Sequence, residues 1–389
     1  MRRKFAALIL ALLILCGCGA PVRKPHEKLY GAWVATTYNL DFPSEPGLSA
    51  AQLKREITSL LDGAQGLGLN AIFLQVRPCG DAIYPSKLYP WSHYLTGEQG
   101  RAPEDGFDPL AFWIEQAHQR GIALHAWINP FRVTQGGADM QMAENNLANT
   151  HPEWTVRYSD GNLYVNPGIP EARDYIVSGV QELLDHYELD GIHFDDYFYP
   201  GADFDDDAEY QGNIVSRADW RRQNVTDFVS AVSRVTRRAG VTFGISPFAI
   251  WRNRASDPAG SDTSGQETYD AHYADTRAWV KQGLVDYIAP QIYWQIGNRA
   301  ADYETLLNWW CDTVRDTDVR LYIGHAGYRT EDAKPGDIWY GADEIRRQMA
   351  MNRDRPEVDG SIHFRLGVYL AHEELSQALK VEYVEGSAQ

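Results

Sequence analysis

Short apolar runs alternate with longer amphipathic segments along most of the chain. The apolar runs are rich in β-branched and aromatic residues, as buried strands are, and they occupy 31–37, 71–77, 123–129, 191–195, 242–246, 287–292, 321–325 and 361–364. The segments between them repeat apolar residues at helical spacing, at 50–67, 109–119, 170–187, 220–238, 273–282, 303–314 and 342–352. Strict strand–helix alternation favours a parallel sheet with helices outside. Eight such units within one domain's length predict a single α/β domain, a (β/α)8 TIM barrel.

The segments after most of the predicted strands are long and rich in proline, glycine and aromatic residues. In a barrel these βα loops gather at the C-terminal face, where barrel enzymes keep their active sites. No glycine-rich dinucleotide fingerprint supports an open, doubly wound sheet instead. We therefore expect one barrel over 29–384, with a site at this face and a short tail at 385–389.

The start of the chain has the pattern of a secretory signal. The cationic residues at 2–4 precede an apolar run at 5–15, which is too short to span a bilayer comfortably. We therefore expect a signal peptide at 1–17.

The end of this signal is similar to a bacterial lipobox, with Leu15-Cys16-Gly17-Cys18 in sequence. It predicts lipidation of Cys18 and an anchored linker at 18–28, which would hold the protein outside the cytoplasm at a bacterial membrane. In a Gram-negative source this would be the outer membrane, because Gly19 is not the aspartate that favours inner-membrane retention. An ordinary cleaved signal with incidental cysteines is the alternative.

Composition narrows the class of partner. The formal net charge of −17 becomes −20 without the three cationic residues at 2–4, and so acidic a chain lacks the electrostatic footprint of a nucleic-acid binder. Aromatic residues make up 12% of the chain, and many lie in polar loops, where their faces suit stacking on sugar rings. Beyond the signal only Cys79 and Cys311 remain, which is too few for a disulfide framework.

Strand alternation indicates which polar side chains enter the barrel. In the fourth predicted strand, Ile192 and Phe194 should face the helices, and His193 and Asp195 should point inward. The same parity turns inward Gln75, Arg77, His125, Trp127, Asn129, Gln291, Tyr293 and His325. Because an unpaired buried polar group costs about 1–3 kcal/mol, so many require a hydrogen-bonded structural network or a wet site. Because these polar side chains come from five strands and converge on one barrel mouth, a functional site is favoured over a structural network.

Asp195 and Asp196 are adjacent carboxylates at the end of the fourth strand. Glycoside hydrolysis usually needs a proton donor and a second carboxylate on opposite sides of the bond. In an extended chain two neighbouring side chains face opposite sides of the strand. Asp195 and Asp196 therefore cannot both serve as the catalytic carboxylates for one glycosidic bond. If Asp195 is catalytic, we expect Asp196 to orient a neighbour or bind sugar; the structural alternative for Asp196 is a cap on the next segment.

Several motifs together resemble the glycosyl hydrolase-like 10 family of bacterial lipoproteins. They are GAWVAT at 31–36, LDFPS at 40–44, QVRP at 75–78, GD at 80–81, PWS at 90–92, HAWINPFR at 125–132, DGIHFDDY at 190–197, GISPF at 244–248, APQIYW at 289–294 and YIGH at 322–325. The resemblance covers Tyr30 to about Tyr369, and it implies a barrel glycosidase without a cofactor. The family includes enzymes that cut peptidoglycan glycan strands stripped of stem peptides, which implies that class of polysaccharide as substrate.

The motif at 190–197 is also similar, more loosely, to the fourth-strand signature of chitinase-type barrels. Tyr197 stands where that signature has its catalytic Glu, and His193 where it has an inner Asp. Tyr293 matches a tyrosine that supports the substrate's N-acetyl group. This resemblance implies an acid at Asp195, a supporting tyrosine at Tyr293 and a 2-acetamido sugar as substrate. With the neighbouring Asp196, these residues are the catalytic candidates. The residues alone leave the second acid open among Asp81, Asp196, Asp270 and Asp275.

The expected substrate-binding residues surround this motif. They are Arg77, Asp81, His125, Asn129, Arg132, His193, Tyr197, Gln291, Trp294 and His325. Muramic acid carries a lactyl carboxylate, which Arg77 or Arg132 could hold as a planar fork. The alternative for these residues is structural order beneath the barrel mouth.

Two other functions remain open. His125, His193, His325 and Asp195 could form the metal site of a polysaccharide deacetylase, although no His-x-His or His-Glu-x-x-His motif is present and we expect no metal. Tyr197 in place of a glutamate also keeps open a non-catalytic, glycan-binding barrel.

Overall fold

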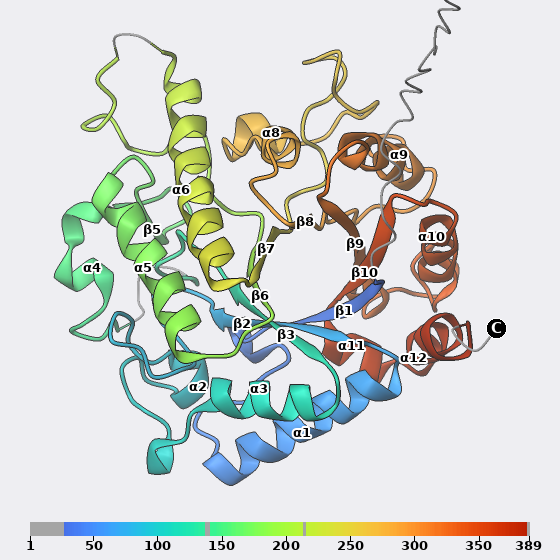
Figure 1. The fold of residues 1–389 in the computed structure, drawn as a ribbon, viewed down its shortest axis with the longest axis horizontal. Helices are drawn as coiled ribbons and strands as arrows, with labels where there is room; N and C mark the ends of the chain where they lie inside the picture. The colour runs from blue at the N-terminus through green and yellow to red at the C-terminus, as the bar shows by residue number, and fades with distance from the viewer. Residues whose placement is uncertain (1–26, 137–140, 213–214, 387–389) are drawn as a thin grey trace, which may run out of the picture.

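The computed structural model describes residues 27–136, 141–212 and 215–386. Eight parallel strands close into a barrel at the centre of the molecule in the order β1-β10-β9-β8-β7-β6-β3-β2 (Figure 1). The barrel strands are β1 (Leu29–Val34), β2 (Ala71–Arg77), β3 (Ala123–Ile128), β6 (Gly191–Phe194), β7 (Thr242–Ile245), β8 (Tyr287–Ile288), β9 (Arg320–Ala326) and β10 (Val358–Phe364). The predicted (β/α)8 barrel is confirmed, and the first strand, in blue, pairs with the last, in red.

Helices surround the barrel, and all but the last two along the chain lie where the sequence predicted helices (Figure 1). They are α1 (Ala50–Gly66), α3 (Pro109–Gln119), α5 (Pro170–His186), α6 (Arg217–Ala239), α8 (Thr276–Lys281), α9 (Tyr303–Val314) and α10 (Asp343–Arg353), followed by α11 (Leu366–Ala371) and α12 (Glu373–Leu379). Local start signals explain several boundaries: Ser49 and Gln52 form a reciprocal capping box on α1, and Asp108 caps α3 just before a first-turn proline. Within the described ranges no helix is both long and apolar enough to cross a bilayer.

Two cores lie on opposite sides of the strands. The inner core fills the barrel with Trp33, Phe73, Trp127, Tyr287, Tyr322 and Ile362. The outer and larger core lies between strands and helices; Phe194, for example, stacks on Phe228 of α6 with ring centroids 5.5 Å apart. Ile192 and Phe194 thus face the helices, as the strand parity predicted.

The parity prediction is wrong at Arg77. A register shift between Gln75 and Arg77 reverses the side on which the last residue of β2 projects. Arg77 lies over the ring of Tyr89, which packs against α5 at Gly179, and it donates to the backbone carbonyl of Asn129. Its guanidinium is therefore buried in the outer core and does not reach the barrel mouth.

The inward prediction for His325 is also wrong. Tyr322 belongs to the inner core, so the third residue after it faces outward. The ring of His325 contacts Gln348 and Asn352 of α10, at 3.1 and 3.0 Å. It is therefore part of a buried polar cluster between the sheet and α10.

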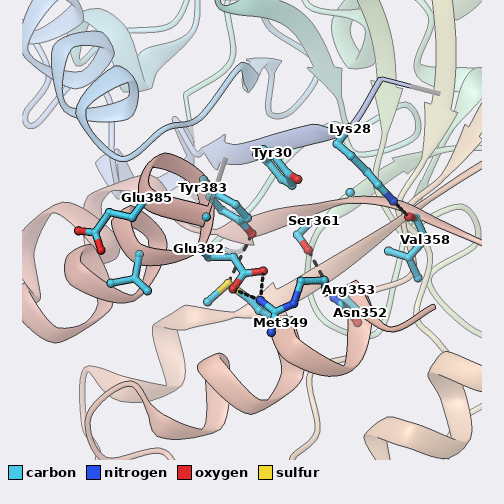
Figure 2. A pocket seen from close by; sticks show the side chains of 13 residues that line it. Lys28, Tyr30, Met349, Asn352, Arg353, Val358, Ser361, Glu382, Tyr383 and Glu385 are labelled. Carbon is cyan, nitrogen blue, oxygen red and sulfur yellow. Dashed lines mark hydrogen bonds and ion pairs between the residues drawn. The ribbon is translucent and has the colours of Figure 1, made fainter. Parts of the chain in front are cut away.

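This polar cluster borders a cavity of about 520 Å³ at the N-terminal end of β1 and β10 (Figure 2). Tyr30 and Tyr383 stack face to face on one side, 4.0 Å apart. On the other side Arg353 makes two contacts to Glu382, at 2.8 and 2.7 Å. The cavity lies at the end of the barrel opposite to the βα loops.

The loops at the C-terminal face carry their own short elements. A two-stranded antiparallel hairpin of β4 (Thr155–Arg157) and β5 (Leu163–Val165) lies between β3 and α5. The short helices α2 (His93–Thr96), α4 (Leu147–Thr150) and α7 (Thr268–Ala271) lie in the connections after β2, β3 and β7. The expected signal peptide and Cys18 lie outside the described residues.

Candidate active site

Two buried carboxyl groups lie directly after β6 at the C-terminal face. Asp195 is 6% exposed and Asp196 is 7% exposed. The strand ends at Phe194 and the chain bends at Asp196, so the alternation of an extended strand no longer applies. Asp195 bonds Asn129 at the end of β3, while Asp196 interacts with Gln291 after β8. The expectation that the two neighbours face opposite sides is therefore wrong, and both belong to the barrel mouth.

A chain of amides orients Asp195. Gln75 Oε1 accepts the backbone N–H groups of Thr36 and Thr37, both at 2.9 Å. Its Nε2 must then face Asn129 Oδ1, to which it donates at 2.7 Å. Asn129 in turn presents its Nδ2 to Asp195 Oδ2. The backbone after β1 thus fixes both amides, and Asp195 receives a donor that favours its ionised form.

The other oxygen of Asp195 has no partner within the described residues. Oδ1 is buried without a hydrogen bond, and leaving such an atom unpaired is costly. The side chain of Trp127 and the backbone N–H of Tyr197 lie near enough to Asp195 to lower its pKa, so they are the protein donors nearest to this carboxylate besides Asn129.

Burial dominates the electrostatics of the acid pair. It raises the pKa of Asp195 to about 6, against the opposing charge of Arg132 and the backbone N–H of Tyr197. Burial, and then the charge of Asp195, raise the pKa of Asp196 well above its ordinary value. Both carboxyl groups are therefore harder to ionise than they would be in water, and the charge of Asp195 opposes the ionisation of Asp196.

Arg132 and Tyr197 lie beside the acids. The guanidinium of Arg132 lies 5.3 Å from the ring centre of Tyr197. Burial lowers the pKa of this guanidinium, but the neighbouring acidic groups, Asp195 first among them, together raise it above its usual value. Tyr197 is partly exposed, with its ring edge-on to Phe248 and His272. Arg132 is thus a cation next to the acid pair.

Tyr293 and Gln291 border Asp196. Burial, with the charge of Asp196, raises the pKa of Tyr293 well above its usual value, so its hydroxyl stays a proton-bearing donor. Gln291 donates to the carbonyl of Ser246 at 2.8 Å. Trp294 follows, half-buried, and its carbonyl accepts a bond from α10 at Gln348.

His125 and His193 lie inside the barrel beneath this mouth, as the parity predicted. Trp33 Nε1 can only donate, and it lies 3.1 Å from His193 Nε2, so His193 carries its proton on Nδ1. That proton goes to the hydroxyl of Tyr287, which lies 3.0 Å away and 3.2 Å from His125 Nδ1. Burial lowers the pKa of His125 to about 4 and that of His193 well below its usual value. Both rings are neutral and buried, which makes them supports for the mouth.

The other three candidates for the second acid make structural contacts away from Asp195. Asp81 is fully buried in the β2–α3 connection, where it accepts from Gln99 at 3.0 Å. Asp275 caps α8 and accepts from Trp251. Asp270 lies in α7 beside Arg222 and Arg252. Only Asp196 among the four lies in direct electrostatic contact with Asp195.

The metal-site arrangement does not form. His325 lies on the outer side of β9, apart from His125 and His193 inside the barrel. Across residues 27–136, 141–212 and 215–386, no group of three or more His, Cys, Asp or Glu side chains could hold a metal ion.

Gln75, Tyr287 and Ser246 were not among the expected site residues. The strand parity had placed Gln75 inward, which was the signal for its role. Tyr287 of β8 contacts both histidines, and Ser246, directly after β7, contacts His193. Nothing in the sequence distinguishes these two residues from core residues.

A closed parallel barrel with an acid pair at the end of its fourth strand has the architecture of glycoside hydrolases. The family model Glycosyl hydrolase-like 10 matches residues 28–340, and the chain belongs to this family. It is 46% identical to the Glycosyl hydrolase YngK of Bacillus subtilis, over 87% of this chain and 68% of that protein. It is 40% identical to the Glycosyl hydrolase DigH of Escherichia coli K12, over 93% of this chain and 92% of that protein.

Solved structures share the fold at low identity. The PgaB (BpsB) glycoside hydrolase domain of Bordetella bronchiseptica superposes with a TM-score of 0.57 at 16% identity, covering 91% of this chain and 98% of that domain. An α-L-fucosidase isoenzyme of Paenibacillus thiaminolyticus gives 0.59 at 14% identity, covering 93% of this chain and 49% of the fucosidase.

Proposed function

We propose that this protein is a glycosidase that cuts peptide-free peptidoglycan glycan strands, with Asp196 as proton donor and Asp195 as its ionised partner. The observation that carries the proposal is the pair of adjacent, buried carboxyl groups at the barrel mouth, in which burial and the charge of Asp195 hold the pKa of Asp196 well above its ordinary value. A carboxylic acid kept protonated at pH 7 is what a general acid requires. Membership of a glycosyl hydrolase-like family supports the reaction class.

The groups at the mouth fit a 2-acetamido sugar. The unpartnered Oδ1 of Asp195 would accept the acetamido N–H and orient its carbonyl oxygen to attack C1. Asp196 would donate its proton to the glycosidic oxygen as the C1–O bond breaks. Water would then add to C1 as the bond between C1 and the acetamido oxygen breaks, which regenerates the acetamido group and returns a proton to Asp196. Tyr293 would hold the acetamido oxygen by its hydroxyl.

Two features support the substrate and the location. Arg132 lies close enough to the acid pair to affect their charge, and a guanidinium would pair with the lactyl carboxylate of muramic acid. The lipobox at Cys18 supports anchoring to a bacterial membrane, outside the cytoplasm. Both are proposals that rest on the residues of this chain.

The test uses the full chain in detergent on peptide-free glycan strands, with products read by mass spectrometry. We expect wild type to release short oligomers, and Asp196→Asn and Asp195→Asn each to lower kcat about 1000-fold. Asp343→Asn, which changes an exposed acid on α10, is the matched control and should leave kcat unchanged. Equal cleavage by wild type and both site variants would refute the assignment, and binding without cleavage would favour a glycan-binding barrel. Loss of activity with a chelator would favour the deacetylase alternative.

A further inference from the structure

The connection between β1 and α1 carries a tyrosine in an unusual position. Tyr38 is 56% exposed, more than any other large apolar or aromatic side chain in the described part of the chain. Its backbone has φ 53° and ψ 20°, and Asn39 after it has φ 53°. Left-handed backbone is unfavourable for a bulky residue, and two in succession persist only where the surroundings hold them.

Hydrogen bonds hold this turn in place. The side-chain amide of Asn39 donates to the carbonyls of Pro43 and Tyr94, at 2.9 and 2.8 Å. The backbone N–H of Asn39 donates to Thr36 at 3.0 Å. The exposed ring of Tyr38 is therefore presented by a fixed backbone, although packing does not require it to be there.

The ring lies over the same loops that build the acid site. It meets Tyr94 edge-on, with centroids 6.1 Å apart. Next to it, Thr37 Oγ1 donates to Gln135 Oε1 at 2.7 Å, and Arg132 donates to the same oxygen at 3.3 Å. A chain of hydrogen bonds thus runs from Thr37, next to Tyr38, through Gln135 to Arg132 beside the acids.

The turn is also bonded to the amides that orient Asp195. The N–H groups of Thr36 and Thr37, immediately before Tyr38, are the donors that fix Gln75. The turn that carries Tyr38 is therefore linked to Asp195 through Gln75 and Asn129.

We infer that Tyr38 is a sugar-stacking subsite for a ring of the glycan some distance from the bond that is cut, with Gln135 as a polar partner. The inference deepens the proposed function, because it takes a glycan strand as the occupant. An exposed, rigid aromatic face next to a hydrogen-bonding amide is the chemistry that binds a pyranose ring. Its contribution is to affinity, while the acid pair performs the chemistry.

The test measures Kd for peptide-free glycan strands by calorimetry, with the full chain in detergent carrying Asp196→Asn to prevent turnover. Adding Tyr38→Gly should weaken binding about tenfold, which is about 1.4 kcal/mol. Glycine accepts the left-handed backbone, so this variant should keep the melting temperature of its parent. Tyr38→Trp keeps an aromatic face and should bind within about twofold of the parent.

The matched control is Tyr340→Ala, which removes a tyrosine of similar exposure, 51%, from the β9–α10 connection. It should leave Kd unchanged. Unchanged binding in Tyr38→Gly, or an equal loss in Tyr340→Ala, would overturn the subsite, as would a parent that does not bind the strands. If the parent binds and Tyr38→Gly weakens it while wild type cleaves nothing, the subsite stands and the hydrolase proposal fails.

Discussion

Two pairs of buried titratable side chains lie at different places in this barrel. Asp195 and Asp196 lie at the C-terminal mouth, and His325 and His363 stack 5.0 Å apart between the sheet and the outer helices. Both pairs are desolvated, and burial shifts the pKa of each group toward its neutral form: upward for the acids, to about 4 for His325, and well below its usual value for His363. A shifted pKa therefore does not distinguish the two regions.

Hydrogen bonding does distinguish them. His363 contacts the hydroxyls of Tyr369 and Tyr383 through its two ring nitrogens, at 3.0 and 2.8 Å, and both nitrogens of His325 are bonded too. Asp195 keeps a buried oxygen without a partner among the described residues. A fully bonded pair stabilises the fold, whereas an unpartnered group at a mouth is available to a substrate.

The largest expected effect is on the histidine pair. His363→Phe keeps the shape of the ring but removes the partner of the buried Tyr369 hydroxyl, so the free energy of unfolding should fall by about 2–4 kcal/mol. Denaturant unfolding measures the loss. Because this pair lies on the outer side of the sheet, kcat per folded molecule should stay at the wild-type value. A fall in kcat at unchanged stability would instead make the histidine pair functional.

Replacing a member of the acid pair should change stability in the opposite direction, because Asp195→Asn is expected to stabilise the fold near neutral pH. The raised pKa of Asp195 means that its proton stabilises the fold below about pH 4, and that this stabilisation is lost as pH rises through about 6. Asp195→Asn removes the loss, so the stability of the variant relative to wild type should increase from pH 4 to pH 7 by about 1–3 kcal/mol. Thermal unfolding of both proteins across this range tests the sign. A difference that is flat with pH would contradict the raised pKa.

The smallest effect tests the link between the two amides and the acid. Gln75→Glu keeps the acceptor for Thr36 and Thr37 but removes the donor to Asn129, which would then turn its own Nδ2 toward the new carboxylate. Asp195 would lose its donor, so kcat should fall about tenfold and the acidic limb of the pH–rate profile, expected near 6, should move to higher pH. An unmoved limb would show that Asn129 does not set the ionisation of Asp195.

The architecture could be predicted from the sequence because each barrel strand is a short apolar run that the next helix follows closely. Capping signals such as Ser49 and Asp108 also lie in the sequence and explain where helices begin. Side-chain direction was less predictable. The register shift at the end of β2 turned Arg77 outward, and such an irregularity has no signature in residue type.

The acid site could be predicted only in part. Asp195 and Asn129 follow from parity, since each ends a strand on its inward side. The joint burial of Asp196 depends on a bend after Phe194, and the role of Gln75 depends on contacts to a turn 38 residues earlier in the chain. Tyr38 could not have been found, because its significance lies in exposure and in a left-handed backbone.

The direction of β1 determines which end of the barrel lies nearer to the N-terminal segment of the chain. All eight barrel strands run the same way, and β1 starts at Leu29, beside the cavity at the end opposite the acid pair. Under the anchoring we propose at Cys18, the chain would therefore enter the barrel at the end opposite the acid pair. An anchored protein of this topology would leave its acid mouth free of the segment that ties it to the membrane.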